Sequence, residues 1–183
     1  IIQGHKNPKL SESGIREAKE LAKKLKDVKF DLAYSSDLLR AERTAEIIAF
    51  EHKLEVQTAK ILRERNFGKF EGKPDEELER VNKILEKLTD EERNSYKMFG
   101  IESDKEIVER LITFLREVAV ANPGKKILAV THGAVMRFFL IKLGVGNHRS
   151  LRPGAVKSSG IIKLQTKGTN NYVKKLSRIQ FTN

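Results

Sequence analysis

The sequence predicts an α/β fold: a three-layer sandwich with a mostly parallel central sheet, helices on both faces and an antiparallel hairpin at the sheet edge near the C-terminus. Two segments, residues 30–49 and 126–143, carry most of this prediction, because each reads as a short apolar strand that leads into a helix. Alternating apolar and polar residues after Pro153 and Gly154 indicate the hairpin.

The elements before the middle of the chain follow a regular order. Apolar residues recur at helical spacing between residues 15 and 25, and Ser11 is a suitable N-cap for that helix. A strand is expected over Phe30–Tyr34. The polar run Ser35-Ser36-Asp37 then caps a helix with apolar residues at helical spacing from Leu38 to Ala49.

The second strand-to-helix unit begins at Ile127–Val130, which is continuous enough for a strand buried on both faces. It runs through Thr131-His132-Gly133 into a helix that reaches Leu143. Two charged helical segments precede it, and we expect the region from about residue 75 to residue 121 to form a helical lid. The hairpin strands are expected over residues 160–165 and 172–181, with a turn at residues 167–171.

Length and composition restrict the class of protein. With 183 residues, the chain fits a single domain spanning residues 1–183. The absence of cysteine excludes disulfide scaffolds, cysteine-ligated metals and cysteine nucleophiles, and makes a reducing cytoplasm the natural compartment. The longest apolar runs, such as Ile127–Val130 and Phe138–Ile141, fall far short of the roughly 20 residues that a membrane-spanning helix needs, so we expect no membrane association.

The positive charge is concentrated in the last third of the chain. The net charge is +11, and the residues from Val118 onward include no Asp or Glu. Such a surface could attract phosphate-bearing partners, but scattered lysines are more often simply solvated. Nucleic acid is disfavoured as a partner, because no helix-turn-helix, aromatic stacking platform or RNA-binding motif accompanies the charge.

Polar residues follow both predicted strands, at the sheet edge where ligands of open α/β sheets bind. Ser36 and Arg40 follow the first strand, and His132 and Gly133 follow the second. Helix N-termini and arginine side chains suit an anion such as phosphate. The alternatives are a surface Arg40 paired with a neighbouring glutamate and a purely structural His132.

The loop Leu62–Gly72 holds Glu64 between two arginines, Arg63 and Arg65, among glycines and phenylalanines. Burial or a bound anion could raise the pKa of this carboxyl enough for it to act as a general acid. The alternative is an exposed glutamate in a charged loop.

Four motifs together resemble the histidine phosphatase superfamily, in its phosphoglycerate mutase-like branch, over nearly the whole chain. They are Leu10-Ser11-Glu12-Ser13-Gly14, the run from Tyr34 to Ala45, the loop Leu62–Gly72 and Val130-Thr131-His132-Gly133.

The resemblance implies a phosphohistidine mechanism with no metal and no cofactor. Arg40 matches a phosphate-gripping arginine, His132 the second histidine of the family, and Glu64 the carboxylate that protonates the leaving oxygen. These three are the predicted catalytic residues. The predicted substrate-binding residues are Gln3, Gly4, Ser36 and Gly133.

One element of the family pattern does not occur in the sequence. The nucleophilic histidine of the family lies in an Arg-His-Gly motif, shortly before the Gln-Gly that Gln3 and Gly4 match. The sequence opens at Ile1 without methionine, so we expect that motif upstream of Ile1, and we expect the chain as printed not to turn over phosphate esters.

The predicted function is therefore hydrolysis of a small anionic phosphate ester, with the ester or inorganic phosphate as partner. Arg63, Arg65 and the basic last third favour a substrate with a second anionic group. The compact segment between residues 75 and 121 favours a phosphatase over the alternative, a phosphoglycerate mutase. A catalytically inactive phospholigand-binding module is a further alternative, and a homodimer is left open.

Overall fold

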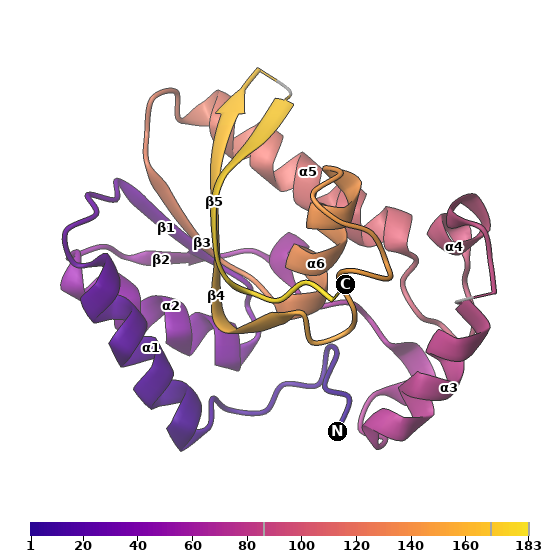
Figure 1. Ribbon diagram of the computed structural model, residues 1–183. Helices are drawn as coiled ribbons and strands as arrows, with labels where there is room; N and C mark the ends of the chain where they lie inside the picture. Colours follow the sequence, from indigo (N-terminus) through magenta and orange to yellow (C-terminus); the bar gives the residue numbers. More distant parts are fainter. Residues whose placement is uncertain (86, 169, 183) are drawn as a thin grey trace.

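A parallel sheet of three strands forms the centre of the computed structural model, which describes residues 1–85, 87–168 and 170–182 (Figure 1). The strand order is β2-β1-β3, with β1 at Leu32–Ser35, β2 at Val56–Thr58 and β3 at Ile127–Val130. In the register, Ala33 of β1 lies between Val56 and Leu128. The predicted parallel pairing of the two strand-to-helix units is confirmed.

Helices cover both faces of this sheet. On one face, α1 (Glu12–Leu25) and α2 (Leu39–Glu51) pack together, and Leu21 and Ile48 meet Leu128 of β3. On the other face lie α5 (Asp104–Ala121) and α6 (Gly133–Lys142). The predicted cap of α1 is present, because the Gly14 amide donates to Ser11 Oγ at 3.1 Å.

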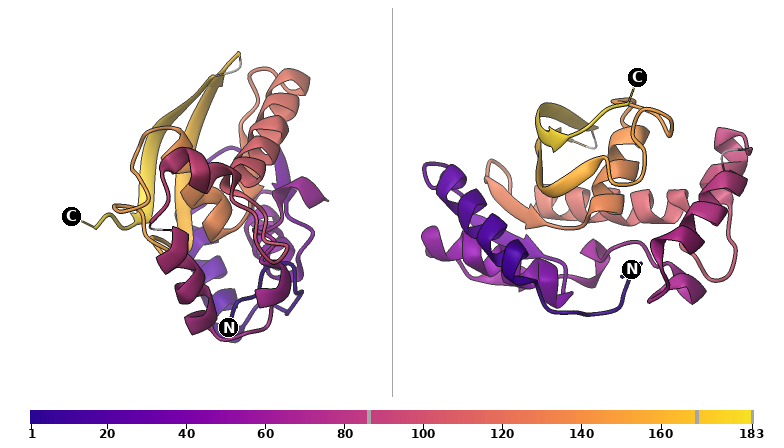
Figure 2. Two further views of the ribbon diagram at one scale, coloured as in Figure 1. Left: turned by 90° about the vertical axis from the view of Figure 1, so that its right-hand side faces the viewer. Right: turned by 60° about the horizontal axis from the view of Figure 1, so that its bottom comes forward.

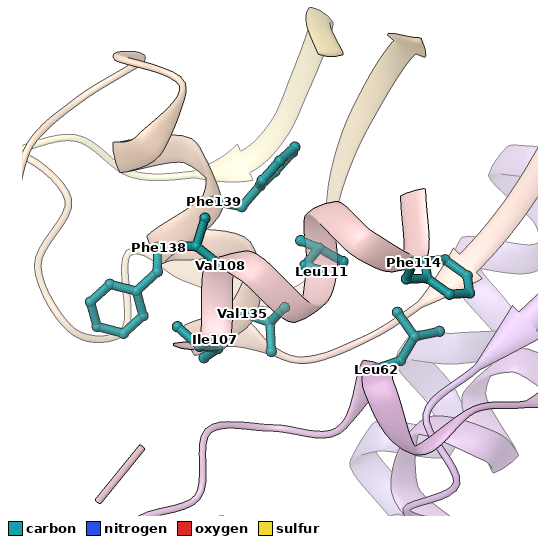
Figure 3. Packing of buried hydrophobic residues seen from close by; sticks show 8 residues of the cluster. All are labelled: Leu62, Ile107, Val108, Leu111, Phe114, Val135, Phe138 and Phe139. Atoms are coloured by element: carbon teal, nitrogen blue, oxygen red, sulfur yellow. The ribbon is translucent and has the colours of Figure 1, made fainter. Parts of the chain in front are cut away.

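The main core lies between α5, α6 and the sheet (Figure 3). Tyr34 of β1 contacts Phe114 of α5 edge to face, with ring centroids 5.5 Å apart. Burying this apolar surface holds both helices in place, and α6 is the helix that His132 precedes. The cluster consists of Leu62, Ile107, Val108, Leu111, Phe114, Val135, Phe138 and Phe139.

Two short helices, α3 (Asp75–Leu85) and α4 (Asp90–Ser95), stand to one side of the main body (Figure 2). Val81 and Leu85 of α3 pack in a second apolar cluster with Ile2. The region expected to form a lid therefore divides: α5 belongs to the main core, whereas α3 and α4 lie outside it. Two short 3-10 helices, η1 (Lys60–Leu62) and η2 (Gly68–Phe70), interrupt the long loop before α3.

The predicted hairpin forms from β4 (Val156–Lys167) and β5 (Asn170–Ile179), which pair antiparallel. Within the described ranges it is a sheet of its own, packed on Leu140 and Leu151 rather than hydrogen-bonded to the parallel sheet. Thr169 of the predicted turn lies outside the described residues.

The structure corrects two local expectations. Strand β3 is only half-buried and Ala129 is exposed, because among the described residues β3 pairs with β1 alone. Helix α2 has Leu38 rather than a serine as N-cap; its first amides are satisfied by Ser36 Oγ, which accepts from Leu38, and by Asn7 Oδ1, which accepts from Leu39 at 2.7 Å. In the described part of the chain, no helix is long and apolar enough to cross a membrane.

Candidate active site

A cavity of about 200 Å³ opens where the N-terminal loop meets the start of α2 and the loop after η1. Four of the predicted site residues, Gln3, Gly4, Arg40 and Glu64, line it. The remaining lining residues are Ile1, Ile2, Phe67, Asp75 and Leu78.

Arg40 is held in the wall of this cavity by backbone carbonyls. Its Nη2 donates to the Gly4 carbonyl at 2.8 Å and its Nη1 to the Lys6 carbonyl at 2.9 Å. Gly4 has φ 52°, and a Cβ there would lie 2.1 Å from Glu71 Oε1, so this position requires glycine. The surface alternative is excluded, since Glu46 pairs with Arg43 instead.

Burial lowers the pKa of Arg40, while Glu64 and Glu71 act in the opposite direction. An arginine remains charged under such a shift. The cavity wall therefore carries a fixed positive charge that forms no ion pair within 4 Å among the described residues.

Glu64 faces the N-terminus of α6. Its Oε1 accepts from the Arg65 amide at 2.8 Å, and its Oε2 accepts from the Ala134 amide at 3.4 Å. Burial raises the pKa of this carboxyl, against the lowering effect of these amides and of Arg40. The carboxyl is therefore more readily protonated than an exposed glutamate, as a general acid requires.

His132 is the N-cap residue of α6 and is 7% exposed. Burial lowers its pKa to about 3, and the positive charges of Arg40 and Arg110 act in the same direction. The imidazole is therefore neutral at pH 7. Its buried Nε2 has no hydrogen-bond partner among the described residues, so the protein leaves this polar atom unsatisfied.

Arg40 interacts electrostatically with both Glu64 and His132, although the three come from distant parts of the sequence. His132 and Gly133 do not line the cavity. Gly133 begins α6 directly after His132. Ser36 is fully buried, and its hydroxyl accepts from the Leu38 amide at 3.3 Å. In this structure Ser36 supports the start of α2 and does not line the cavity.

Arg110 and Glu102 support the site but were not among its predicted residues. Arg110 Nε donates to Glu102 Oε1 at 2.6 Å, and its two Nη atoms donate to the carbonyls of Ile61 and Glu64 at 2.7 and 3.1 Å. His5 also contacts the Glu64 carbonyl, through Nε2 at 2.8 Å. These bonds fix the backbone that carries Glu64.

The two arginines beside Glu64 are engaged elsewhere. Arg63 forms a bidentate pair with Asp37, with distances of 2.7 and 2.6 Å, and Arg65 Nη2 lies 2.8 Å from Asp104 Oδ1. Both guanidinium groups are thus neutralised within the protein. The structure removes them as a reason to expect a second anionic group on the substrate, which corrects that interpretation.

The arrangement suits a small tetrahedral anion. Arg40 supplies a fork of N–H donors and a permanent charge, and a helix N-terminus lies beside it. His132 supplies an imidazole nitrogen, and Glu64 a carboxyl with a raised pKa. No group of three or more metal-ligating side chains occurs within residues 1–85, 87–168 and 170–182.

Comparisons with known proteins show the family of this chain. The histidine phosphatase superfamily (branch 1) matches residues 1–178. Phosphoglycerate mutase-like protein 4 of Arabidopsis thaliana is 37% identical over 139 residues, 74% of this chain and 60% of the relative, so the match spans well under two thirds of that protein's length. The uncharacterized phosphatase PhoE of Bacillus subtilis is 34% identical over 79% of this chain and 69% of its own.

Solved structures of similar proteins share the fold of this chain. A phosphoserine phosphatase from Entamoeba histolytica, determined with 3-phosphoglyceric acid, has a TM-score of 0.74 at 25% identity and covers 96% of this chain and 87% of its own. YhfR of Bacillus stearothermophilus shares the fold, with a TM-score of 0.80 at 24% identity, over 94% of this chain and 86% of its own. The chain belongs to the histidine phosphatase superfamily, branch 1.

Proposed function

We propose that this protein hydrolyses small anionic phosphate monoesters through a phosphohistidine intermediate. One observation carries the proposal: the cavity wall places the charge of Arg40 beside Glu64, whose pKa is raised, and within electrostatic reach of His132. Family membership and relatives described as phosphatases support it.

In the proposed reaction, the histidine of an Arg-His-Gly motif, expected upstream of Ile1, attacks phosphorus. A nitrogen–phosphorus bond forms, the ester phosphorus–oxygen bond breaks, and Glu64 gives its proton to the leaving oxygen. Water then attacks the phosphorus of the phosphohistidine and gives a proton to Glu64, while the nitrogen–phosphorus bond breaks and releases inorganic phosphate and the free histidine. Arg40 and His132 stabilise the charge on the transferring group, which is the main requirement of phosphoryl transfer.

The first test uses the chain as printed and measures binding of inorganic phosphate by calorimetry. We expect Arg40→Ala to weaken binding by at least about tenfold, because a charge-assisted bond of roughly 1.5 to 3 kcal/mol is lost. Arg43→Ala, one turn further along α2 and paired with Glu46 at the surface, is the matched control and should bind phosphate normally. Equal affinities for all three proteins would refute the assignment of the cavity.

The second test uses the full gene product with an aryl phosphate and with 3-phosphoglycerate. Release of inorganic phosphate, together with an acid-labile phosphohistidine, is the expected result. Interconversion of phosphoglycerates without net hydrolysis would identify a mutase instead, as several relatives are described. Phosphate binding with neither activity would identify a phospholigand-binding module.

Three further features belong to the proposal. We infer that residues 1–183 act as one domain. We also infer that α3 and α4 form a lid over the cavity lined by Arg40 and Glu64, called the phosphate cavity below, because Asp75 and Leu78 of α3 line it. We also propose that the protein is cytoplasmic, because disulfide bonds do not persist in that reducing compartment and a chain without cysteine forms none. Light scattering of the purified protein would decide between a monomer and a homodimer.

A further inference from the structure

A second cavity, of about 430 Å³, lies between η2, α3 and the segment before Gly100. Its volume is about twice that of the phosphate cavity, and the two share no lining residue. A volume of this size is typical of sites for small organic molecules. The cavity is lined by Lys69, Phe70, Lys73, Glu77, Arg80, Val81, Ile84, Met98 and Phe99.

The inside of this cavity presents aromatic and aliphatic surface to solvent. Phe99 is 50% exposed and Ile84 46% exposed, and both line the same hollow. The ring of Phe99 meets that of Phe70 at 75°, with centroids 5.6 Å apart. Single exposed apolar residues are ordinary on a protein surface, but several gathered in one hollow indicate a ligand that covers them.

Phe99 is held in this exposed position by a strained backbone. It has φ 55°, a left-handed conformation that is rare for a bulky residue. Its carbonyl accepts from the Lys69 amide at 3.1 Å, and the neighbouring Gly68 has no Cβ, which would lie 2.3 Å from that carbonyl. The glycine therefore permits the contact that keeps the ring at the mouth of the cavity.

The rim of the cavity is positively charged. Of its three basic residues, Arg80 pairs with Glu77 at 3.3 Å. Lys69 and Lys73 are exposed and have no ion pair among the described residues, and Lys73 Nζ lies 5.4 Å from the centroid of the Phe70 ring. The rim thus keeps two positive charges without an ion pair among the described residues, and one of them, that of Lys73, lies over the ring of Phe70.

We propose that this cavity binds a small aromatic anion: a planar ring system that packs on Phe70, Phe99 and Met98, with a carboxylate or similar group that pairs with Lys69 and Lys73. Aromatic rings pack favourably on other rings and on methionine sulfur, and a carboxylate complements the two unpaired ammonium groups. The site is separate from the phosphate cavity and does not depend on the reaction proposed there.

The test measures binding of naphthoate to the chain as printed, by calorimetry and by amide chemical shifts. We expect saturable binding, with shifts at Phe70 and Phe99. The neutral analogue naphthylmethanol should bind at least about tenfold more weakly, because it lacks the charge.

Two double variants separate the site from general charge effects. Lys69→Glu with Lys73→Glu should weaken naphthoate binding by about tenfold or more. Lys83→Glu with Lys87→Glu makes the same change in net charge at exposed residues outside the cavity, and should leave the affinity unchanged. All four lysines are exposed, so both variants should fold, which circular dichroism checks.

The proposal is overturned if naphthoate fails to bind at its solubility limit, or if the two double variants bind it equally well. It is also overturned if naphthylmethanol binds as tightly as naphthoate, since the cavity would then select only for apolar surface. Phosphate binding should be normal in both double variants, so a failure of this proposal is distinguishable from a failure of the proposed phosphatase function.

Discussion

Glu64 and Arg65 are neighbours in the chain, yet their side chains enter two different charged clusters. Glu64 lies with Arg40 at the wall of the phosphate cavity, and Arg40 also interacts electrostatically with the buried His132 behind it. Arg65 turns to the other side of the loop and pairs with Asp104 at the start of α5. Both clusters contain a carboxyl whose pKa is raised by burial and at least one arginine whose pKa is lowered by it.

The cluster around Asp104 is built into the packing of the protein. Asp104 is 3% exposed and lies 2.8 Å from Arg65, and 3.9 and 3.7 Å from Arg93 and His148. Arg137 donates to the Leu151 carbonyl. The guanidinium carbons of Arg65 and Arg137 lie 4.8 and 4.7 Å from the centre of the Phe138 ring, which belongs to the main core.

The comparison teaches that a shifted pKa does not by itself identify a reactive group. In the Asp104 cluster the charges face one another and an aromatic ring, so they hold α5, α6 and the loop together. In the phosphate cluster Arg40 and Glu64 line a cavity, whereas Asp104 and its arginine partners line neither of the two cavities described above. Loss of the first cluster should therefore cost stability, and loss of the second should cost ligand binding.

The largest expected effect is that of Asp104→Ala. The variant leaves Arg65, Arg93 and Arg137 buried without their shared carboxylate, which should lower the free energy of unfolding by about 3 to 5 kcal/mol. Urea denaturation measures it. Glu46→Ala, which breaks an exposed pair with Arg43, is the control and should cost less than about 1 kcal/mol. Equal losses in the two variants would contradict the structural role of the Asp104 cluster.

The next effect concerns pH and His132. As the pH falls below 6.5, the unfolded chain binds a proton at this histidine, while the folded protein does so only near pH 3. Folding stability is therefore lost as the pH falls through this window, by roughly 2 to 3 kcal/mol between pH 6.5 and about pH 4.5. His132→Asn removes this contribution.

Urea titrations of both proteins at several pH values give the difference directly. The stability of the parent protein should fall more steeply with decreasing pH than that of His132→Asn. Parallel curves would mean that His132 titrates normally in the folded protein. Saturating inorganic phosphate should reduce the difference, because a bound anion favours the protonated imidazole.

The smallest effect is expected for Glu64→Gln. The folded pKa of Glu64 is raised, so ionising it disfavours the folded state, and its stability contribution is lost as the pH rises through that pKa. A neutral amide should therefore leave the stability unchanged or raise it by up to about 1 kcal/mol at pH 8. A loss comparable to that of Asp104→Ala would show that Glu64 is as structural as Asp104.

The predictable parts of the fold are those with a strong local pattern. The run Ile127–Val130 became β3 with its predicted bounds, and Ser11 caps α1. Strand β2 was not predicted, because it has only three residues, two of them exposed. Helix α4 was not predicted either, since it is polar throughout; the capping box of Thr89 and Glu92 was the available signal.

The site also has parts that the sequence predicts and parts that it does not. Family motifs point to Arg40, Glu64 and His132, and the structure brings them together. The partners of Arg63, Arg65 and Arg110 could not be predicted, because they lie 26, 39 and 8 residues away, and no local pattern specifies such pairs. The sequence did not predict that β4 and β5 form a sheet of their own. Alternating apolar and polar residues indicate a strand, but they do not indicate the strands with which it pairs.

The cap of α2 couples its folding to the N-terminal loop. Asn7 accepts from the Leu39 amide, and the carbonyls of Gly4 and Lys6 hold Arg40, the next residue. An isolated α2 peptide lacks these partners, so its first turn should fray and become ordered only when the loop docks. Hydrogen exchange at the Leu39 amide therefore reports, from within the helix, whether the phosphate cavity has assembled.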